Sequence, residues 1–361
     1  MPSGLRGAIG QLLIGSCPGT TIPVELRSLA REFGLGGIIL FTRNIEAPEQ
    51  VAELACDAQS LGGELPLWVS VDQEGGRVAR LRAPFTEWPP MAALGRSGSV
   101  ALASRFASAL AAELKAVGVT LDYAPVLDIH TNPDNPVIGD RALAGDAETV
   151  GRLGRAIIRG LQESGVAACG KHFPGHGDTS VDSHLDLPVV EHPPDRIRRV
   201  ECVPFREAIA EHVAFMMTAH LLVPSLDERK PATLSRRIVF DLLRDELGFE
   251  GVILSDDLEM KAIAATVAVP DAAVQAIAAG CDGLLICGGN IDVQAAALEA
   301  LVHAVEDERI PYGRVEDALA RQRRAKERFL AAPVLAARPA ARRIAGWDAH
   351  RRIAEEMARY L

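Results

Sequence analysis

The sequence alternates between short apolar runs, which are typical of β-strands, and longer amphipathic stretches, which are typical of helices. The expected strands cover residues 8–14, 37–41, 67–72, 120–127, 167–171, 215–219, 252–255 and 283–287. The expected helices cover residues 48–61, 101–117, 147–164, 195–211, 237–247, 271–279 and 292–305. Because apolar strands that alternate with helices form parallel sheets, we predict an α/β fold, a (β/α)8 barrel of the TIM type. A doubly wound open sheet is the alternative, although no GxGxxG motif follows the first strand.

Polar residues follow most of the expected strands at their carboxyl ends. In a barrel these ends converge on one rim, where active sites form, whereas in an open sheet they would be spread along an edge. The residues are Arg43, Asn44, Asp72, Glu74, Asp128, His130, Lys171, His172, His220, Asp256 and Asp257. Their placement favours the barrel and predicts a polar site on its rim.

The whole chain is expected to form a single domain. We predict that residues 1–335 form the barrel and that residues 336–361 form a helical tail packed on it. A strongly charged helical pattern covers residues 312–330, and an arginine-rich segment follows Pro333. The sequence holds no internal repeat, low-complexity tract or linker that would require a second domain.

Charge and hydropathy limit the partners of the chain. The formal net charge of −10 disfavours nucleic acid and anionic membranes, since neither would attract the chain. No apolar stretch approaches the roughly 18 residues that a membrane span needs, and the amino-terminal segment has no cleavage signature. We therefore expect a cytoplasmic protein. Six cysteines without CxxC spacing favour buried reduced thiols over a disulfide framework.

The segment from Lys171 to Pro188, KHFPGHGDTSVDSHLDLP, holds three histidines and three aspartates but little apolar surface. Such a segment is suited to presenting charge and proton-transfer groups rather than to stabilising itself by burial. Asp182 and His184 lie two residues apart, so in extended backbone the carboxylate could orient the imidazole. An imidazole held in this way is a competent general acid and base. The alternative is a solvated turn beside a surface histidine.

Two adjacent carboxylates, Asp256 and Asp257, follow the expected strand 252–255. Adjacent carboxylates repel one another, so burying both as simple structure requires cationic partners. One of them could instead cap the following helix. Donors at other strand ends, together with Asp72, suit a ligand rich in hydroxyl or acyl groups, although any one arginine alone would more often form a salt bridge. These donors are Arg77, Arg80, Arg141, Lys171 and His172.

The same histidine-rich segment could instead bind a metal, because five of its side chains could together ligate zinc or a similar ion. They are His172, His176, Asp178, Asp182 and His184. The segment has neither HxH nor HExxH spacing, and Lys171 places a cation nearby. We therefore expect no metal and no other cofactor, with metal-dependent hydrolysis as the alternative.

Five motifs together resemble glycoside hydrolase family 3, and specifically its bacterial β-N-acetylglucosaminidase branch. They are KHFPGHGDTSVDSHLDLP, DQEGGRVARL, NPVIGDRA, MMTAHLLVPSLD and VILSDDLEM, and they occur in the family's order between Gly36 and Gly289. The first motif is long and highly specific, whereas GVILSDD would be a weak signal by itself. Leu143 departs from the pattern, since the branch often has an aromatic residue there.

The resemblance implies a role for each matching residue. Asp256 would be the nucleophile that attacks the anomeric carbon, and His184 would be the acid and base, with Asp182 as its partner. Asp257 would have a supporting role. The pocket for a terminal N-acetylglucosamine (GlcNAc) would be lined by Asp72, Arg80, Arg141, Lys171 and His172.

Physical chemistry agrees with these implied roles. A nucleophilic carboxylate must be ionised, and nearby Lys171, Arg80 or Arg141 would favour that state of Asp256. Gly175 and Gly177 would let the segment that carries the acid and base move.

We therefore expect a metal-independent, retaining exo-β-N-acetylglucosaminidase that acts by double displacement on a small GlcNAc-terminated carbohydrate, in the recycling of cell-wall muropeptides. Within the same family, the alternatives are a β-glucosidase or β-xylosidase and a GlcNAc phosphorylase, in which phosphate replaces water. From a different class, the alternative is a catalytically silent sugar-binding protein.

Overall fold

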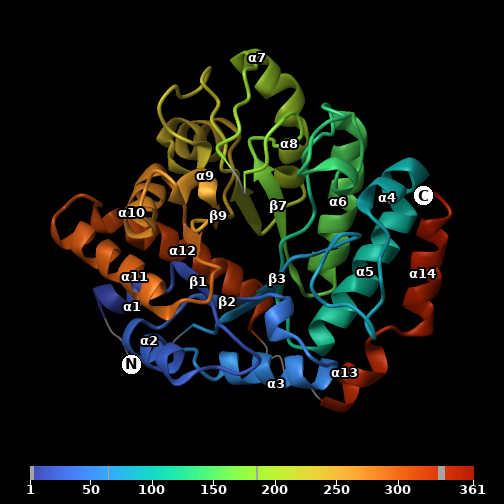
Figure 1. The fold of residues 1–361 in the computed structure, drawn as a ribbon, viewed down its shortest axis with the longest axis horizontal. Coiled ribbons are helices and arrows are strands. Elements are labelled where there is room, and N and C mark those ends of the chain that lie inside the picture. The colour runs from blue at the N-terminus through green and yellow to red at the C-terminus, as the bar shows by residue number, and fades with distance from the viewer. Residues whose placement is uncertain (1–3, 64, 184–185, 332–337) are drawn as a thin grey trace.

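The computed structural model describes residues 4–63, 65–183, 186–331 and 338–361. Parallel strands close into a barrel in the order β1-β10-β9-β8-β7-β6-β3-β2, and helices surround it (Figure 1). The strands are β1 (Leu13–Ser16), β2 (Gly37–Leu40), β3 (Trp68–Val71), β6 (Leu121–Asp122), β7 (Ala167–Phe173), β8 (Phe215–Thr218), β9 (Val252–Asp257) and β10 (Gly283–Leu285). The predicted (β/α)8 fold is confirmed.

The barrel strands are apolar on both faces because both faces are covered. Every residue of β1, β2, β3, β7 and β8 is buried, as expected where helices pack on the outside and side chains fill the inside. Inside the barrel, the ring of Trp68 meets the ring of Phe215 edge to face, with 5.2 Å between centroids. The barrel interior is therefore a packed core, and a ligand has to bind at its rim.

Helices connect the strands in the expected alternation. Local sequence explains two of the starts, since the side chains of Ser99 and Asp146 accept the N–H groups of Leu102 and Thr149 and so cap the helices that follow. The helical elements are α1 (Leu5–Gly10), α2 (Val24–Phe33), η1 (Thr42–Asn44), α3 (Pro48–Gln59), α4 (Met91–Ser97), α5 (Val100–Ala116), η2 (Gly139–Arg141), α6 (Ala147–Glu163), α7 (Pro194–Arg196), η3 (Ile197–Glu201), α8 (Val203–Ala210), η4 (Ala232–Leu234), η5 (Arg237–Glu246), α9 (Lys261–Ala264), α10 (Val269–Ala279), α11 (Ile291–Glu306), α12 (Tyr312–Phe329), α13 (Arg338–Ile344) and α14 (Asp348–Ala358).

The prediction of a strand over residues 8–14 was wrong at its start. The helix α1 extends to Gly10, and the strand begins only at Leu13. A short apolar run such as this has no periodicity that separates helix from strand. The predicted helix 195–211 is divided at Cys202 into η3 and α8, and α2 was not among the predicted helices.

The amino-terminal end of the barrel is closed by α12. From this helix the buried Lys326 donates hydrogen bonds to Oε1 of Gln11, at 2.7 Å, and to the carbonyl of Gly36, at 3.0 Å. Burial lowers the pKa of Lys326 to about 7. The opposite end, where the strands finish, is the rim on which the sequence places the polar residues.

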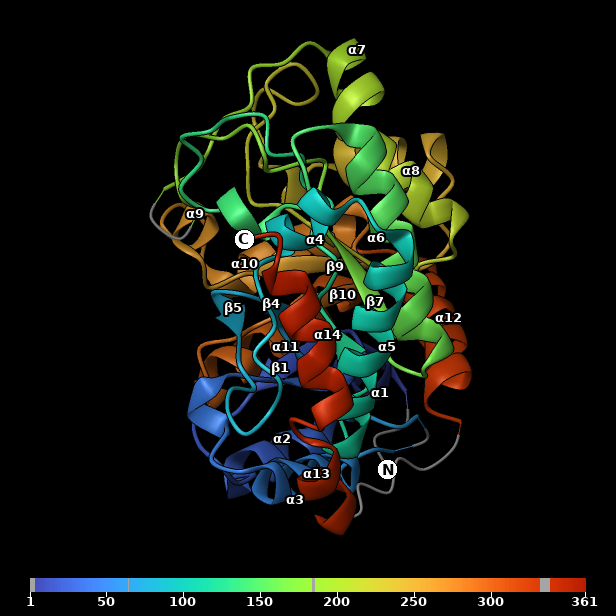
Figure 2. The ribbon, with the colours of Figure 1, turned by 90° about the vertical axis from the view of Figure 1, so that its right-hand side faces the viewer.

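The carboxyl-terminal helices pack on one side of the barrel. The helix α13 contacts α3 and α5, and α14 runs along α5 and α4 (Figure 2). Glu113, buried in α5, joins three segments. It accepts hydrogen bonds from the N–H and hydroxyl of Thr86, at 3.0 and 2.6 Å, from the N–H of Gly346, at 3.1 Å, and from Nδ1 of His350, at 2.8 Å. The predicted domain boundary at residue 335 lies outside the described residues and stays a prediction.

Two further expectations concern cysteines and membranes. All six cysteines are free thiols, and five of them are buried, so the prediction of reduced thiols is confirmed. In the part of the chain that the structure describes, no helix combines the length and apolarity that crossing a membrane requires.

Candidate active site

A pocket opens where the barrel strands end, and it collects most of the predicted site residues. Its polar lining comes from residues far apart in the sequence. It includes Asp72, Arg80, Arg141, Lys171, His172, His176, Ser183, Asp256 and Asp257. Phe41, Tyr123, Met217 and Met260 contribute to its apolar lining. A pocket with a few convergent polar groups on an apolar wall is the usual form of a small-molecule site.

A tight hairpin places Asp72 and Arg80 side by side. Asp72 follows β3, and the hairpin of β4 (Gln73–Gly75) and β5 (Val78–Ala79) comes directly after it. The side chain of Gln73 accepts the N–H groups of Arg80 and Leu81, at 2.8 and 2.9 Å, and so fixes the returning strand. As a result, Nη2 of Arg80 lies 3.4 Å from Oδ2 of Asp72. The GG pair in DQEGG is required, since Gly75 and Gly76 have φ angles of 111° and 57°.

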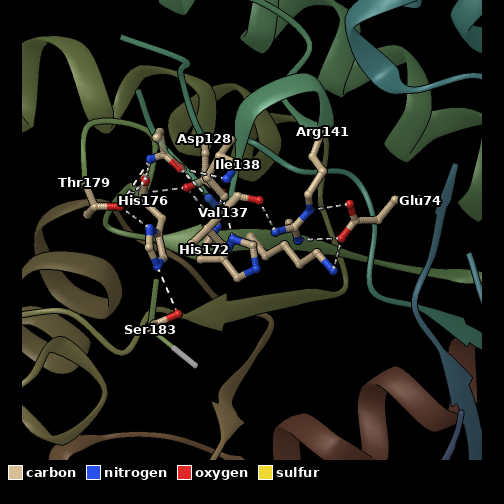
Figure 3. Close-up of polar contacts among 12 residues, drawn as sticks. Glu74, Asp128, Val137, Ile138, Arg141, His172, His176, Thr179 and Ser183 are labelled. Carbon is tan, nitrogen blue, oxygen red and sulfur yellow. Dashed lines mark hydrogen bonds and ion pairs between the residues drawn. The ribbon is translucent and has the colours of Figure 1, made fainter. Parts of the chain in front are cut away.

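Glu74 is the centre of a buried ion cluster beneath the pocket (Figure 3). Arg141 binds its carboxylate in a bidentate manner, with Nε 2.9 Å from Oε2 and Nη2 2.8 Å from Oε1. The ammonium of Lys171 lies 2.6 Å from Oε1 of Glu74 and 2.8 Å from Oδ1 of Asp72. Two carboxylates therefore hold the two cations in place.

In this cluster the neighbouring charges shift the pKa values more strongly than burial does. Burial alone would raise the pKa of Glu74, but Arg141 and Lys171 hold that pKa well below its ordinary value. Burial alone would lower the pKa of Lys171, but Asp72 and Glu74 raise that pKa above its ordinary value. All members of the cluster are therefore charged at neutral pH and present fixed donors and acceptors to a ligand.

Asp128 orients His172, the second predicted ligand on β7. Its Oδ2 lies 2.7 Å from Nδ1 of His172, and its carboxylate also accepts the backbone N–H groups of His172 and His176. Because a carboxylate accepts only, the His172 ring donates from Nδ1. Burial alone would raise the pKa of Asp128, but His172 and His176 lower it. Asp128 is thus an ionised support for the ring.

The glycines beside His176 allow close packing. A Cβ atom at Gly177 would lie 1.8 Å from the carbonyl oxygen of Ile129. The adjoining residues are fastened to the loop after β6, since Asn135 Nδ2 donates to the carbonyl of His176, at 2.9 Å, and to Oγ1 of Thr179, at 3.2 Å. Gly177 is therefore required for close packing, and the mobility expected from Gly175 and Gly177 stays a prediction.

Asp256 and Asp257 end β9 at the pocket. Oδ1 of Asp256 accepts the N–H of Asp257, at 2.8 Å. Oδ1 of Asp257 accepts the N–H groups of Glu259 and Cys287, at 3.1 and 3.2 Å, so this carboxylate makes the turn contacts that a cap would make. Burial raises the pKa of Asp257 to about 7.

The cations expected to pair with Asp256 bind other carboxylates. Lys171 pairs with Asp72 and Glu74, Arg141 pairs with Glu74, and Arg80 pairs with Asp72. The three cations still line the same pocket as Asp256.

The predicted acid and base segment is described in part. Asp182 is half-buried, whereas His184 lies outside the described residues. Ser183, between them, lines the pocket, and its hydroxyl lies 3.2 Å from Nε2 of His176. The roles predicted for Asp182 and His184 stay predictions.

A metal centre was the alternative for this segment. Within residues 4–63, 65–183, 186–331 and 338–361, no three His, Cys, Asp or Glu side chains are grouped as metal ligands. His172 and His176 instead bond to Asp128 and Thr179.

Sequence reasoning placed Glu74 and Asp128 at strand ends but gave them no role. Both are acidic residues close behind an apolar run, Glu74 two residues after Asp72 and Asp128 directly after Leu127, and this is the signal that could have singled them out. Their partners come from other elements, Arg141 from η2 and Lys171 and His172 from β7, so only the closed barrel brings the pairs together.

Comparison with known proteins gives consistent results. A family model described as "Glycosyl hydrolase family 3 N terminal domain" matches residues 5–325. A "Beta-hexosaminidase" of Pseudomonas aeruginosa (strain PAO1) is 42% identical over 289 residues, which cover 78% of this chain and 85% of that protein. "Beta-hexosaminidase A" of Pseudoalteromonas piscicida is 38% identical over 284 residues, 73% of this chain but only 47% of that longer protein. A solved glycoside hydrolase family 3 β-N-acetylglucosaminidase from Paenibacillus sp. has a TM-score of 0.93 and 42% identity, and the match covers 99% of this chain and 68% of that one.

Proposed function

The chain belongs to glycosyl hydrolase family 3 and is a glycoside hydrolase, and from this premise we propose that it removes terminal β-linked GlcNAc by a retaining, double-displacement reaction. The names of the relatives, β-hexosaminidase and β-N-acetylglucosaminidase, support this choice of sugar. The observation that carries the proposal is the pocket itself, in which Asp256 shares one cavity with Asp72, Lys171 and His172.

The pocket groups suit a sugar that carries hydroxyl and acetamido groups. Asp72 has both oxygens close to cations, at 2.8 and 3.4 Å, so it stays ionised and accepts hydrogen bonds from sugar hydroxyls. Lys171, Arg141 and the ring of His172 supply donors that are fixed before the ligand arrives. Fixed donors limit the entropy that is lost when a sugar binds and is oriented.

In the first chemical step, the carboxylate of Asp256 attacks the anomeric carbon while the bond to the aglycone oxygen breaks. The imidazolium of His184, oriented by Asp182, gives its proton to that oxygen. In the second step, neutral His184 takes a proton from water, whose oxygen attacks the anomeric carbon and releases Asp256. Two inversions at the same carbon retain its configuration.

We place the reaction in the cytoplasm, on small GlcNAc-terminated carbohydrates such as muropeptides released from the cell wall. The net charge of −10 and the absence of an apolar span in the sequence support a partner that is neither nucleic acid nor membrane.

Replacing Asp256 tests the nucleophile. Asp256→Asn should lower turnover of a nitrophenyl β-GlcNAc by about 10³-fold or more and leave the melting temperature unchanged. The matched control is Asp257→Asn, which removes the adjacent carboxylate and should retain far more activity. A fluorinated GlcNAc-type donor should label the peptide that contains Asp256. Near-parental turnover in Asp256→Asn, or a label elsewhere, would contradict the assignment.

The same assay separates the other acceptors and sugars. Aryl glucosides and xylosides should be poor substrates, and added phosphate should yield no GlcNAc 1-phosphate. Turnover of glucosides above that of GlcNAc glycosides would replace the proposed sugar, and formation of GlcNAc 1-phosphate would replace water as the acceptor.

A further inference from the structure

His176 is buried, yet its ring reaches the pocket wall. Its backbone N–H donates to Oδ1 of Asp128, at 2.6 Å, and its Nδ1 lies 2.7 Å from the hydroxyl of Thr179. Only 2% of the residue is exposed, but it lines the pocket together with Ser183. Nδ1 is thus bonded to Thr179, while Nε2, on the other side of the ring, can contact the pocket wall.

The available nitrogen of this ring bonds to Ser183. The distance from Nε2 of His176 to Oγ of Ser183 is 3.2 Å (Figure 3). A hydroxyl donates or accepts as needed, so the bond forms in either tautomer of the ring. Burial lowers the pKa of His176 to about 4, so the ring is neutral at physiological pH.

Ser183 is fixed from a second direction. Its carbonyl accepts the N–H of Ala262, at 3.2 Å, in the helix α9. This helix follows β9, the strand that ends in Asp256 and Asp257. Ser183 therefore lies between a buried histidine and the element that continues from the nucleophile candidate.

Asp128 connects this anchor with the sugar site. The same carboxylate that holds the ring of His172 also holds the backbone of His176. The two imidazole rings meet edge to face, with 6.0 Å between centroids. A continuous chain of hydrogen bonds thus runs from His172 through Asp128 and His176 to Ser183.

We propose that His176 is a positioning residue for general acid catalysis, which sets the place of the segment around Asp182 through its hydrogen bond to Ser183. The inference rests on the proposed function, in which the neighbours of Ser183 supply the acid and base. It assigns His176 no proton transfer to substrate. Its effect is on the precision with which the acid and base segment meets the leaving oxygen, and a displacement of about 1 Å in such a group can cost about 100-fold in rate.

Two substitutions separate the contacts of His176. Asn has its amide where Nδ1 lies, so His176→Asn keeps the contact with Thr179 and loses the contact with Ser183. Gln reaches further, so His176→Gln can restore a bond to Ser183. Ser183→Ala removes the other partner of the same hydrogen bond. It deletes a single hydroxyl group, a change small enough to preserve folding.

The decisive readout is dependence on the leaving group. An activated aryl aglycone leaves with little protonation, whereas an unactivated alkyl or sugar aglycone requires the acid. For His176→Asn and Ser183→Ala, kcat/KM on the unactivated substrate should fall about 10- to 100-fold more than on the activated one. His176→Gln should recover part of the difference, and the double variant His176→Asn/Ser183→Ala should be no worse than the poorer single variant.

Several outcomes would overturn the inference. Equal losses on both substrates in Ser183→Ala would mean that the contact is only structural. Parental values for both single variants would mean that the bond has no role. A buried histidine far from the pocket provides the control, and His350→Gln should leave the ratio between substrates unchanged. If the parent enzyme cleaves no GlcNAc glycoside, the proposed function is wrong and this inference is wrong with it. If the parent is active and the His176 and Ser183 variants leave the ratio of kcat/KM between the two substrates unchanged, only the inference is wrong.

Discussion

Glu74 gives the sharpest test of how the pocket is held together. Glu74→Gln keeps the shape of the side chain and removes its charge. The carboxylate is 1% exposed and receives three short contacts from Arg141 and Lys171, at 2.6, 2.8 and 2.9 Å. With its amide oxygen in the place of Oε1, glutamine keeps the two contacts made there but without the negative charge, and it turns an NH2 group toward Nε of Arg141, so the third contact is lost.

The size of the effect follows from these contacts. A hydrogen bond to a charged group contributes about 1.5–3 kcal/mol, so losing one contact and weakening two to a neutral acceptor should together lower the free energy of unfolding by about 3–6 kcal/mol. This agrees with the ~3–5 kcal/mol that follows when one partner of a buried ion pair is removed. Because Arg141 and Lys171 also line the pocket, kcat/KM should fall about 100-fold through loss of alignment.

The pH dependence has a definite sign. The folded-state pKa of Glu74 lies below its ordinary value, so its contribution to stability is present above the unfolded pKa and lost as pH falls through the folded pKa. The difference between parent and variant should therefore be constant from about pH 8 to pH 5 and shrink in stronger acid.

Chemical denaturation and steady-state kinetics measure both effects. Glu74→Asp, which keeps the charge, should lose less stability than Glu74→Gln. Glu356→Gln removes an exposed carboxylate that pairs with Arg105 at 2.8 Å, and it should leave the melting temperature unchanged. If the free energy of unfolding of Glu74→Gln lies within about 0.5 kcal/mol of the parental value, the reasoning from buried charge is refuted.

Three further predictions concern buried titratable groups. Burial raises the folded-state pKa of Asp257 to about 7, so parental stability should fall as pH rises from about 4 to 7, and Asp257→Asn should flatten that slope in denaturation curves. Burial lowers the pKa of Lys326 to about 7, so parental stability should rise between about pH 7 and pH 10, and Lys326→Met should remove this rise. Glu113→Gln leaves all four donors without a charged acceptor, so it should lower the free energy of unfolding by about 2–4 kcal/mol and speed proteolytic removal of α14, as followed by mass spectrometry.

The barrel was predictable because its strands carry a local signal. Short runs such as those of β8 and β9 begin with consecutive apolar residues and end in polar ones. Where that signal is ambiguous, as around Ala8, the prediction failed at the boundary between α1 and β1. Periodicity does not record which of two neighbouring apolar turns will be covered by a sheet.

The sequence predicted which residues line the candidate site, but it did not predict the hydrogen bonds and ion pairs among them. The sequence placed Asp72, Lys171 and Asp256 at strand ends, and the pocket contains all three. It did not indicate that Glu74 and Asp128 hold the ligand candidates, since those contacts join residues 67 and 44 positions apart. Pairing across a closed barrel depends on tertiary geometry, which single-chain patterns do not encode.

The hydrogen bonds of Glu113 affect the order in which the chain can fold as it leaves the ribosome. The carboxylate sits in α5, yet two of its donors, Gly346 and His350, are 233 and 237 residues further along the chain. Barrel closure likewise waits for β10, which pairs with β1. An emerging nascent chain therefore exposes the face of α5 that α14 later covers, until the residues around Gly346 and His350 have been made. The last contacts of this fold form long after α5 itself has been synthesised.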